Sequence, residues 1–320
     1  MIPVYLFSGF LGSGKTTVLL NVLNQLKEDG LRPAIVLNEA GEMNVEKELF
    51  ANETVVELLN GCICCTIQDD LKVELQRFLT INDRSVDVLL IEGTGIANPR
   101  EIIEVLTDPP FIEQLALQSV IGIIDASRYL EYRSLFSSSK EIRAVLKEQV
   151  AESTLLLLNK QDLVDGRTLH KVEEKLKKDK KPGATILSCS YGKVPTEELL
   201  KPRIKVDTGK DHAYSVAASS HASHSHHHHH HDIQAIKLDL EQPVTEKELQ
   251  RWLIDQGDQL IRAKGYVRLQ ENDLLVQFQY ASKQLSVRKS KEEVPPCLIL
   301  IGVDLNRETL AKSLHTVTNV

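Results

Sequence analysis

A glycine-rich segment at residues 9–17, GFLGSGKTT, constrains the fold of this chain more than any other feature. It follows an apolar run at residues 3–8 and precedes a helical pattern at residues 16–28, which ends at Gly30. The segment fits the pattern G-x-x-x-x-G-K-[ST], which requires this strand–loop–helix context. The alternative is a chance match at a glycine-rich turn, which the flanking elements disfavour. The sequence therefore predicts a phosphate-binding loop between a buried strand and a helix.

The residues of this loop have distinct expected roles. Its glycines let backbone N–H groups turn toward phosphate oxygens, and the helix N-terminus adds positive potential. Lys15 is expected to contact the β- and γ-phosphates of a nucleotide, and the Thr16 hydroxyl to coordinate Mg²⁺. The predicted nucleotide-binding residues of the loop are Gly9, Gly12, Ser13, Gly14, Lys15, Thr16 and Thr17.

Apolar runs recur through the first two-thirds of the chain. After the run at residues 3–8, they occupy residues 33–38, 86–92, 119–125, 154–159 and 184–188. These runs are nearly continuous rather than alternating, which is typical of strands covered on both faces. Helical stretches lie between them at residues 69–79, 141–151 and 167–178. The alternation predicts an α/β fold of the P-loop NTPase type, a mostly parallel sheet wrapped by helices.

The character of the chain changes after Pro202. Residues 206–232 are polar, poor in large apolar side chains and rich in histidine, which is typical of a linker or an exposed loop. Strand patterns follow at residues 233–240, 265–269, 274–280 and 297–305, with helical patterns at 245–256 and 306–315. We therefore expect a nucleotide-binding domain at residues 1–205, a histidine-rich segment at 206–232 and a small α+β domain at 233–320.

The net charge and the cysteine content limit which partners and which cellular compartment are expected. The net charge of −7 gives no electrostatic reason to expect nucleic acid or an anionic membrane as a partner. No apolar run approaches the roughly 20 residues that a membrane-spanning helix needs. The N-terminus lacks the pattern of a signal peptide, and five cysteines with three clustered do not form a secreted disulfide framework. The expected compartment is the cytoplasm, with reduced thiols.

A second nucleotide-binding pattern, NKQD, follows a buried strand and ends at Asp162. The carboxylate of Asp162 can accept hydrogen bonds from the N1–H and the exocyclic amine of guanine, whereas adenine does not offer that pair of donors. An unmatched buried carboxylate is strongly penalised, so a single residue can discriminate between the bases. A solvated turn is the alternative, but the position after a phosphate-binding loop favours GTP over ATP. The segment SCSYG at residues 188–192 is a candidate for closing the base pocket with backbone N–H groups.

An acidic residue ends the apolar run at residues 86–92. Glu92 is followed by glycines in IEGTG, which allow the backbone to approach a γ-phosphate. This arrangement predicts a Walker-B-like role, in which Glu92 holds Mg²⁺ through a water molecule. Because a glutamate at a strand end is common by chance, the prediction depends on the neighbouring motifs.

The motif GCICC at residues 61–65 concentrates three of the five cysteines. A disulfide between the adjacent Cys64 and Cys65 is unfavourable, because its preferred geometry conflicts with a trans peptide bond. Three close thiolates suit zinc, with cobalt or nickel as alternatives. Glu42 and Glu39 are candidates for a fourth ligand. The competing interpretation is that one or two of these cysteines pack as small hydrophobes.

Nine of the eleven histidines lie between His212 and His231, six of them consecutive at residues 226–231. An engineered tag normally sits at a terminus, so the internal position and the interspersed histidines favour a native tract. Neutral imidazoles on an exposed segment would bind zinc or nickel at several overlapping sites, more loosely than a preformed thiolate site. The tract is therefore interpreted as a storage or capture segment.

The motifs occur in an order that resembles one known family. GFLGSGKTT, NEAGE, NGCICC, IEGTG and NKQD follow one another as in the CobW-type GTPases, also called zinc-regulated GTPase metallochaperones. The resemblance covers essentially the whole chain, because the segment AKGYVRL is similar to the C-terminal domain of that family. It implies a P-loop GTPase domain, an α+β C-terminal domain, and slow GTP hydrolysis coupled to metal binding and delivery.

The resemblance also assigns residues. It implies a C-x-C-C metal motif formed by Cys62, Cys64 and Cys65, phosphate and Mg²⁺ binding by Lys15 and Thr16, and guanine binding by Asn159, Lys160 and Asp162. Glu42 and Glu39 are further candidates for orienting the attacking water. One departure is Ala40, where the family usually reads NEFGE, although the flanking acidic residues remain.

Two classes of function stay open from the sequence. The first is a GTPase that delivers a metal, zinc before cobalt or nickel, to a client metalloprotein, with cobalt handling for cobalamin synthesis as a variant. The second is a zinc storage or buffer protein whose GTPase activity is regulatory or vestigial. Hydrolysis that responds to zinc would separate them, because a pure buffer has no reason to couple the two. The expected cofactors are GTP, Mg²⁺ and Zn²⁺, and a homodimer is left open.

Overall fold

The computed structural model describes residues 1–37, 54–57, 67–81, 86–209, 233–290 and 293–318. Contacts within the chain divide it into two compact units, one formed by Ile2–Arg203 and one by Ile204–Val320. The two units differ in architecture, because the first contains a parallel sheet and the second a largely antiparallel one.

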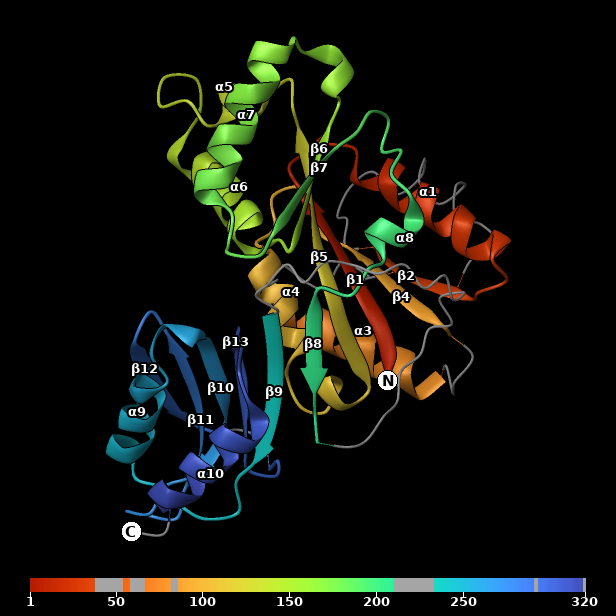
Figure 1. Ribbon diagram of the computed structural model, residues 1–320. Coiled ribbons are helices and arrows are strands. Elements are labelled where there is room, and N and C mark those ends of the chain that lie inside the picture. Colours follow the sequence, from red (N-terminus) through yellow and green to blue (C-terminus); the bar gives the residue numbers. More distant parts are fainter. Residues whose placement is uncertain (38–53, 58–66, 82–85, 210–232, 291–292, 319–320) are drawn as a thin grey trace, which may run out of the picture. The chain divides into compact units, whose positions relative to one another are not determined.

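The first unit is built on a parallel sheet (Figure 1). Within the described residues, seven strands lie in the order β3-β2-β4-β1-β5-β6-β7, and every neighbouring pair is parallel. The strands are β1 Ile2–Gly9, β2 Pro33–Leu37, β3 Thr54–Glu57, β4 Val88–Glu92, β5 Leu115–Asp125, β6 Leu155–Asn159 and β7 Thr185–Ser188. The chain leaves β1 toward one edge of the sheet and leaves β4 toward the other. In open parallel sheets, ligands bind beyond the carboxyl ends of the strands at such a reversal.

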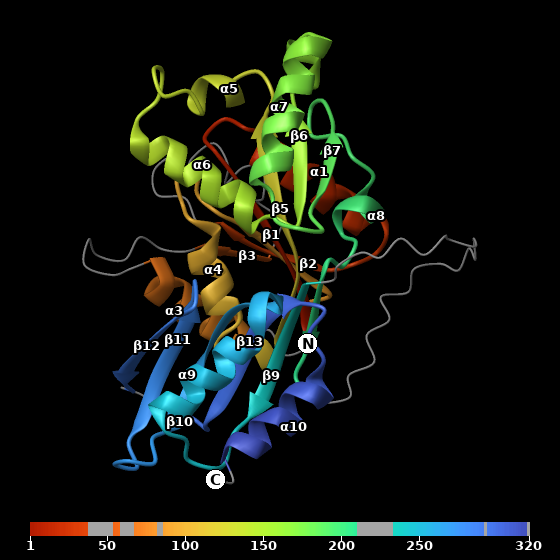
Figure 2. The ribbon, with the colours of Figure 1, turned by 60° about the vertical axis from the view of Figure 1, so that its left-hand side comes forward.

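Helices cover both faces of this sheet (Figure 2). They are α1 Lys15–Glu28, α3 Ile67–Ile81, α4 Pro99–Leu106, α5 Tyr129–Tyr132, α6 Lys140–Glu152, α7 Gly166–Asp179 and α8 Thr196–Leu199, with 3-10 turns η1 Phe111–Glu113 and η2 Gln161–Leu163. On one face, α1 packs against Tyr5 and Phe7 of β1. On the other face, Val150 of α6 and Val172 of α7 pack with β6. The strands are therefore mostly apolar without alternation, as is typical of parallel strands covered on both faces, and several of them end in a polar residue.

The α/β prediction is confirmed, and a strand lies at each of the six apolar runs. The first unit also contains elements that were not predicted, namely β3, α4, the four-residue helices α5 and α8, and the turns η1 and η2. β3 has only four residues, too few for a distinct pattern. α4 has a recognisable start, because the Asn98 side chain accepts a hydrogen bond from the Arg100 N–H and Pro99 is the first helical residue.

The second unit contains a sheet with the order β12-β11-β10-β13-β9-β8 among the described residues. Its strands are β8 Ile204–Asp207, β9 Ile233–Asp239, β10 Leu260–Arg268, β11 Leu275–Ala281, β12 Gln284–Lys289 and β13 Cys297–Val303. Neighbours are antiparallel except β8 and β9, which are parallel. Strand β8 begins inside the range 1–205 assigned from the sequence to the first domain, and it pairs only with β9 among the described strands.

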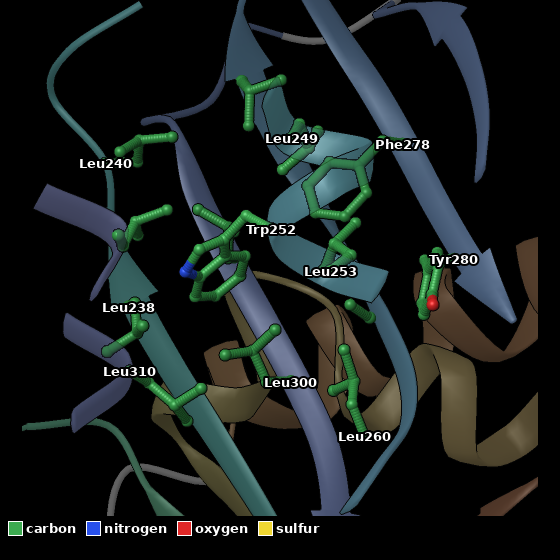
Figure 3. Close-up of a cluster of buried hydrophobic side chains, with 14 of the residues drawn as sticks. Leu238, Leu240, Leu249, Trp252, Leu253, Leu260, Phe278, Tyr280, Leu300 and Leu310 are labelled. Carbon is green, nitrogen blue, oxygen red and sulfur yellow. The ribbon is translucent and has the colours of Figure 1, made fainter. Parts of the chain in front are cut away.

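Two helices cover one face of the second sheet, α9 Glu246–Asp255 and α10 Arg307–Thr318, and the 3-10 turn η3 Gly257–Gln259 follows α9. Figure 3 shows Trp252 and Leu253 of α9 among Leu238, Leu300 and Phe278 of the strands. The indole N–H of Trp252 donates to Ser313 Oγ of α10 at 3.0 Å. At the start of α9, Thr245 and Glu248 form a capping box. The predicted small α+β architecture is confirmed.

The described helices are also informative about membranes. Across the parts of the chain that the structure places, no helix combines the length and the apolar character needed to cross a bilayer.

Candidate functional site

The phosphate-binding loop connects β1, which ends at Gly9, with α1, which begins at Lys15. Gly14 has φ 99°, and a Cβ there would lie 2.6 Å from Nδ2 of Asn159. A Cβ at Gly9 would lie 2.3 Å from the carbonyl oxygen of Ile123. Glycine is therefore required at both positions by the close approach of neighbouring strands and their side chains.

Two polar residues of the loop are buried. Lys15 is buried and is the first residue of α1, so its side chain begins at the helix N-terminus. The hydroxyl of Ser13 is buried and has no hydrogen-bond partner among the described residues. Buried polar groups are almost always hydrogen-bonded. The Ser13 hydroxyl can therefore still donate a hydrogen bond, which fits a loop that binds phosphate oxygens.

Thr16 and Glu92 meet beside this loop. The Thr16 hydroxyl donates a hydrogen bond to Oε1 of Glu92 at 3.1 Å. Glu92 ends β4, where it is 2 % exposed and lies in register with Phe7 of β1 and Leu37 of β2. A hydroxyl and a carboxylate at this separation are oxygen donors of the kind that Mg²⁺ prefers. The two residues therefore fit the magnesium site expected from the sequence, and their role as its ligands stays a prediction.

The NKQD residues contact the phosphate-binding loop through its backbone. The Asn159 amide donates from Nδ2 to the Ser13 carbonyl at 3.0 Å, and its Oδ1 accepts from the Gly192 N–H at 3.0 Å. The Lys160 ammonium donates to the Gly12 carbonyl at 2.7 Å. The structure thus brings two residues of the second pattern onto the first, although the two patterns lie far apart in the sequence.

Asp125 is a residue of this site that the sequence analysis missed. Its Oδ2 accepts from the Lys160 ammonium at 2.7 Å, and its Oδ1 accepts from the N–H and the hydroxyl of Ser127 at 2.9 and 2.6 Å. Burial acts to raise the pKa of Asp125, but these hydrogen bonds outweigh it and hold the pKa below its usual range. An acidic residue at the end of a buried strand, next to the strand that precedes NKQD, was the available signal.

The segment at residues 188–192 lies beside the same strand end. The Cys189 N–H donates to the Leu158 carbonyl at 2.9 Å, and Asn21 of α1 donates to the Gly192 carbonyl at 3.1 Å. Burial raises the pKa of the Cys189 thiol to about 11, and the Gly192 N–H offsets part of this shift. Asp162 lies in η2 with its side chain exposed. Its role toward guanine, and that of residues 188–192, stay predictions.

The predicted metal motif lies outside the described residues. This holds for Cys62, Cys64 and Cys65, for the candidate ligands Glu39 and Glu42, and for the histidine tract. The described cysteines, Cys189 and Cys297, are buried and are not joined in a disulfide. Within the described ranges, no group of three histidine, cysteine, aspartate or glutamate side chains is arranged to hold a metal ion.

Comparison with known families agrees with this geometry. Residues 3–188 match the model of the CobW/HypB/UreG nucleotide-binding domain, which is more than half of the chain. The chain belongs to the CobW/HypB/UreG family. Residues 233–318 match the cobalamin synthesis protein cobW C-terminal domain. The resemblance to CobW-type proteins is thereby confirmed.

This CobW-family chain is similar in sequence to several proteins that are named for metal handling, including the following three. The zinc chaperone YjiA of Escherichia coli is 28% identical over 97% of this chain and 96% of its own length. The zinc chaperone CobW of Pseudomonas aeruginosa is 25% identical over 98% of this chain and 91% of its own length. The zinc-regulated GTPase metalloprotein activator 1 of Dictyostelium discoideum is 35% identical over 62% of this chain. The match spans about half of that relative, 48% of its length.

Proposed function

We propose that this chain binds and hydrolyses GTP and uses the cycle to deliver zinc, held at its C-x-C-C motif, to a client metalloprotein. The proposal that the chain binds and hydrolyses GTP rests on a continuous set of contacts around the phosphate-binding loop. The Thr16 hydroxyl lies 3.1 Å from Oε1 of Glu92. The backbone carbonyls of Ser13 and Gly12 in the loop accept hydrogen bonds from Asn159 and Lys160, respectively. This combination fits a guanine nucleotide whose phosphates and base are bound by adjoining strand ends.

In the proposed reaction, the residues of this chain supply positioning and charge. Lys15, buried at the start of α1, places its ammonium against the β- and γ-phosphates together with the helix N-terminus. Thr16 would hold Mg²⁺ directly and Glu92 through water. Mg²⁺, when bound, neutralises charge that develops on the phosphate oxygens. Fixed positive charge of this kind lowers the barrier because it needs no reorganisation during the reaction.

The base is proposed to be recognised by Asp162 and the neighbouring residues. Its carboxylate would accept hydrogen bonds from guanine N1–H and the exocyclic amine. Asn159 and Lys160 are fixed to the phosphate-binding loop, so the base-binding and phosphate-binding segments are held at a set spacing. That spacing orients the triphosphate before reaction.

Zinc is proposed as the cargo rather than as a resident cofactor. The thiolates of Cys62, Cys64 and Cys65 are suitable ligands, with Glu42 or Glu39 as a fourth. Support comes from the names of the relatives, two zinc chaperones and a zinc-regulated GTPase metalloprotein activator. If nucleotide and zinc bind to coupled sites, each changes the affinity of the other by the same factor.

The nucleotide half is tested by competition and by one variant. GTP and GDP are expected to displace a fluorescent guanine nucleotide in the presence of Mg²⁺, whereas ATP is expected to compete poorly. Lys15→Ala should abolish hydrolysis and leave the circular dichroism spectrum unchanged. Equal competition by ATP and GTP would contradict base recognition, and normal turnover in Lys15→Ala would contradict the proposed phosphate site.

The zinc half is tested in a protein whose nine tract histidines are replaced by serine. This protein should still bind about one zinc ion tightly, because thiolates form the tight site. Cobalt in place of zinc should give thiolate-to-metal charge-transfer absorption. Replacing Cys64 and Cys65 with serine should remove both signals, and zinc should then no longer alter the GTPase rate. Absence of the absorption in the cysteine-containing protein would contradict the metal motif.

Storage of zinc is the second candidate function, and the histidine tract favours it. A store would bind several zinc ions loosely through the tract and would hydrolyse GTP at a rate independent of zinc. A zinc-dependent GTPase rate that persists after the histidines are replaced supports delivery, whereas a zinc-independent rate supports storage.

A further inference from the structure

Gln149 is a polar residue in the core of the first unit. It lies in α6, is 0 % exposed, and is followed in the helix by the core residue Val150. A side-chain amide removed from water is unfavourable unless its polar atoms are hydrogen-bonded. A fully buried glutamine in a helix that packs on a sheet therefore needs an explanation.

Its contacts lie in the loop that follows Glu92. The Gln149 Nε2 donates to the carbonyl oxygens of Gly95 at 3.2 Å and Ala97 at 3.3 Å. The reverse orientation of the amide would place its oxygen against two carbonyl oxygens, so these partners fix the orientation. The Oε1 has no hydrogen-bond partner among the described residues. What the amide supplies is therefore its two N–H donors.

The loop held in this way, residues 93–98, lies against the phosphate-binding loop. The Gly93 N–H donates to the Phe7 carbonyl at 2.9 Å, which continues the pairing of β4 with β1. A Cβ at Gly95 would lie 2.8 Å from the backbone nitrogen of Leu11 and 2.4 Å from its Cδ2. Between the two carbonyls that Gln149 contacts, the side chain of Ile96 is 65 % exposed. The loop is thus positioned through its backbone rather than by burial of that side chain.

The same turn of α6 also contacts the residue at the start of α4. Arg100 lies 3.3 Å from Oε2 of Glu148 and 3.2 Å from Oε1 of Glu152. These ion pairs and the Gln149 contacts together connect residues 95–100 to α6. The ion pairs are partly exposed and therefore weak, whereas the Gln149 contacts are buried and act directly on the loop backbone.

We propose that Gln149 is a positioning residue for nucleotide hydrolysis. By fixing the Gly95 and Ala97 carbonyls, it sets the path of residues 93–98 beside Leu11, where the backbone meets the terminal phosphate of a nucleoside triphosphate. The inference rests on the proposed GTPase function. GDP lacks that phosphate, so its affinity does not depend on the position of this loop.

Two variants and a matched control test this role. Gln149→Leu removes both donors with little change in volume, and Gln149→Asn keeps an amide but draws it back by one methylene. Lys147→Leu places the same leucine on the exposed side of α6. The measurements are the rate of single-turnover GTP hydrolysis and the equilibrium affinity for GDP, with exchange of the backbone amides in residues 93–98 followed by mass spectrometry.

Both Gln149 variants are expected to hydrolyse GTP roughly tenfold to a hundredfold more slowly, the effect of misplacing a group at the reacting phosphate. Their affinity for GDP should equal that of the wild type, and residues 93–98 should exchange faster. The control should match the wild type throughout. GTP turnover unchanged in both variants, or turnover and GDP affinity falling together, overturns the positioning role while leaving the GTPase proposal intact. A wild type that binds neither GDP nor GTP overturns the proposed function, and this inference with it.

Discussion

The Lys160 ammonium lies 2.7 Å from Oδ2 of Asp125 and 2.7 Å from the carbonyl oxygen of Gly12. Lys160 has φ 60° and ψ 33°, in the left-handed region that costs a non-glycine residue roughly 1–2 kcal/mol. The ion pair and the hydrogen bond to Gly12 offset this cost. The Lys160 side chain thereby connects the phosphate-binding loop after β1 with the carboxyl ends of β5 and β6.

Asp125→Asn should weaken nucleotide binding, because it removes the charge that holds the Lys160 ammonium. A hydrogen bond to a charged group contributes about 1.5–3 kcal/mol, so the affinity for GDP should fall by at least about tenfold. Isothermal titration calorimetry with GDP measures the change. Asp87→Asn is the control, since Asp87 forms an ion pair with Arg32 at 3.0 Å outside this site. Equal effects of the two substitutions would contradict the specific role of Asp125.

Thr16→Val should remove the proposed magnesium ligand at nearly constant side-chain volume. A bound metal ion contributes several kcal/mol of charge stabilisation in such reactions, so GTP hydrolysis should fall by roughly two orders of magnitude. Titration of the hydrolysis rate with Mg²⁺ measures the effect. Binding of GDP in the presence of EDTA should be equal for variant and wild type. If the variant shows the magnesium dependence of the wild type, Thr16 is not a ligand.

Arg133→Met should destabilise the first unit. The Arg133 guanidinium lies 2.6 Å from Oδ2 of Asp179, and the side chains are only 13% and 18% exposed. Its removal leaves the Asp179 carboxylate with little solvent contact, which should lower the free energy of unfolding by about 3 kcal/mol. Urea denaturation followed by far-UV circular dichroism measures the loss.

The matched control for Arg133→Met is Lys177→Met on α7. Lys177 lies 2.9 Å from Oε1 of Glu174, but these side chains are 53% and 48% exposed. An exposed pair at this helical spacing contributes little to stability, so its removal should lower the free energy of unfolding far less than Arg133→Met does. A loss as large as that of Arg133→Met would show that exposure does not decide the strength of these pairs.

Cys189 should make the stability of the first unit fall at alkaline pH. Burial raises the pKa of its thiol from an ordinary value near 9 to about 11 in the folded protein. Because the folded pKa is the higher one, this contribution is complete below pH 9 and is lost as the pH rises toward 11. Two pKa units correspond to about 3 kcal/mol.

The test compares wild type with Cys189→Ala in urea at pH 8, 9.5 and 11. The variant is expected to be less stable at pH 8, because it leaves a small cavity. The difference between the two proteins should shrink as the pH rises, since only the wild type loses the contribution of the thiol. A difference that stays constant from pH 8 to 11 would contradict the buried, neutral state of Cys189.

The strands of the first sheet could be predicted because burial on both faces favours apolar residues at successive positions, without alternation. β6, with the sequence LLLLN, is the plainest case. β8 and β12 lie at the edges of the second sheet, and β12 alternates between half-buried and exposed residues. Such short, polar edge strands give little hydrophobic signal, so neither was predicted.

The site was predictable where its residues are neighbours in sequence and not where distant elements meet. The phosphate-binding loop and NKQD are each local patterns with a geometric reason. The contact of Lys160 with Asp125 spans 35 positions, and that of Gln149 with Gly95 spans 54. In the sequence Gln149 is one polar residue in an amphipathic helix, and its burial follows only from how α6 meets the loop after β4.

The parallel pairing of β8 with β9 has an evolutionary consequence for the histidine tract. Residues 208–232 leave one strand of the second sheet and return to its neighbour, while the chain passes between the two units at Arg203 and Ile204. Closing a longer connection is inexpensive, because each doubling of its length costs only about 0.6 kcal/mol. Mutation can therefore add or remove histidines here without altering the covalent path between the units. Selection is free to change the number of histidines in this segment separately from both folded cores.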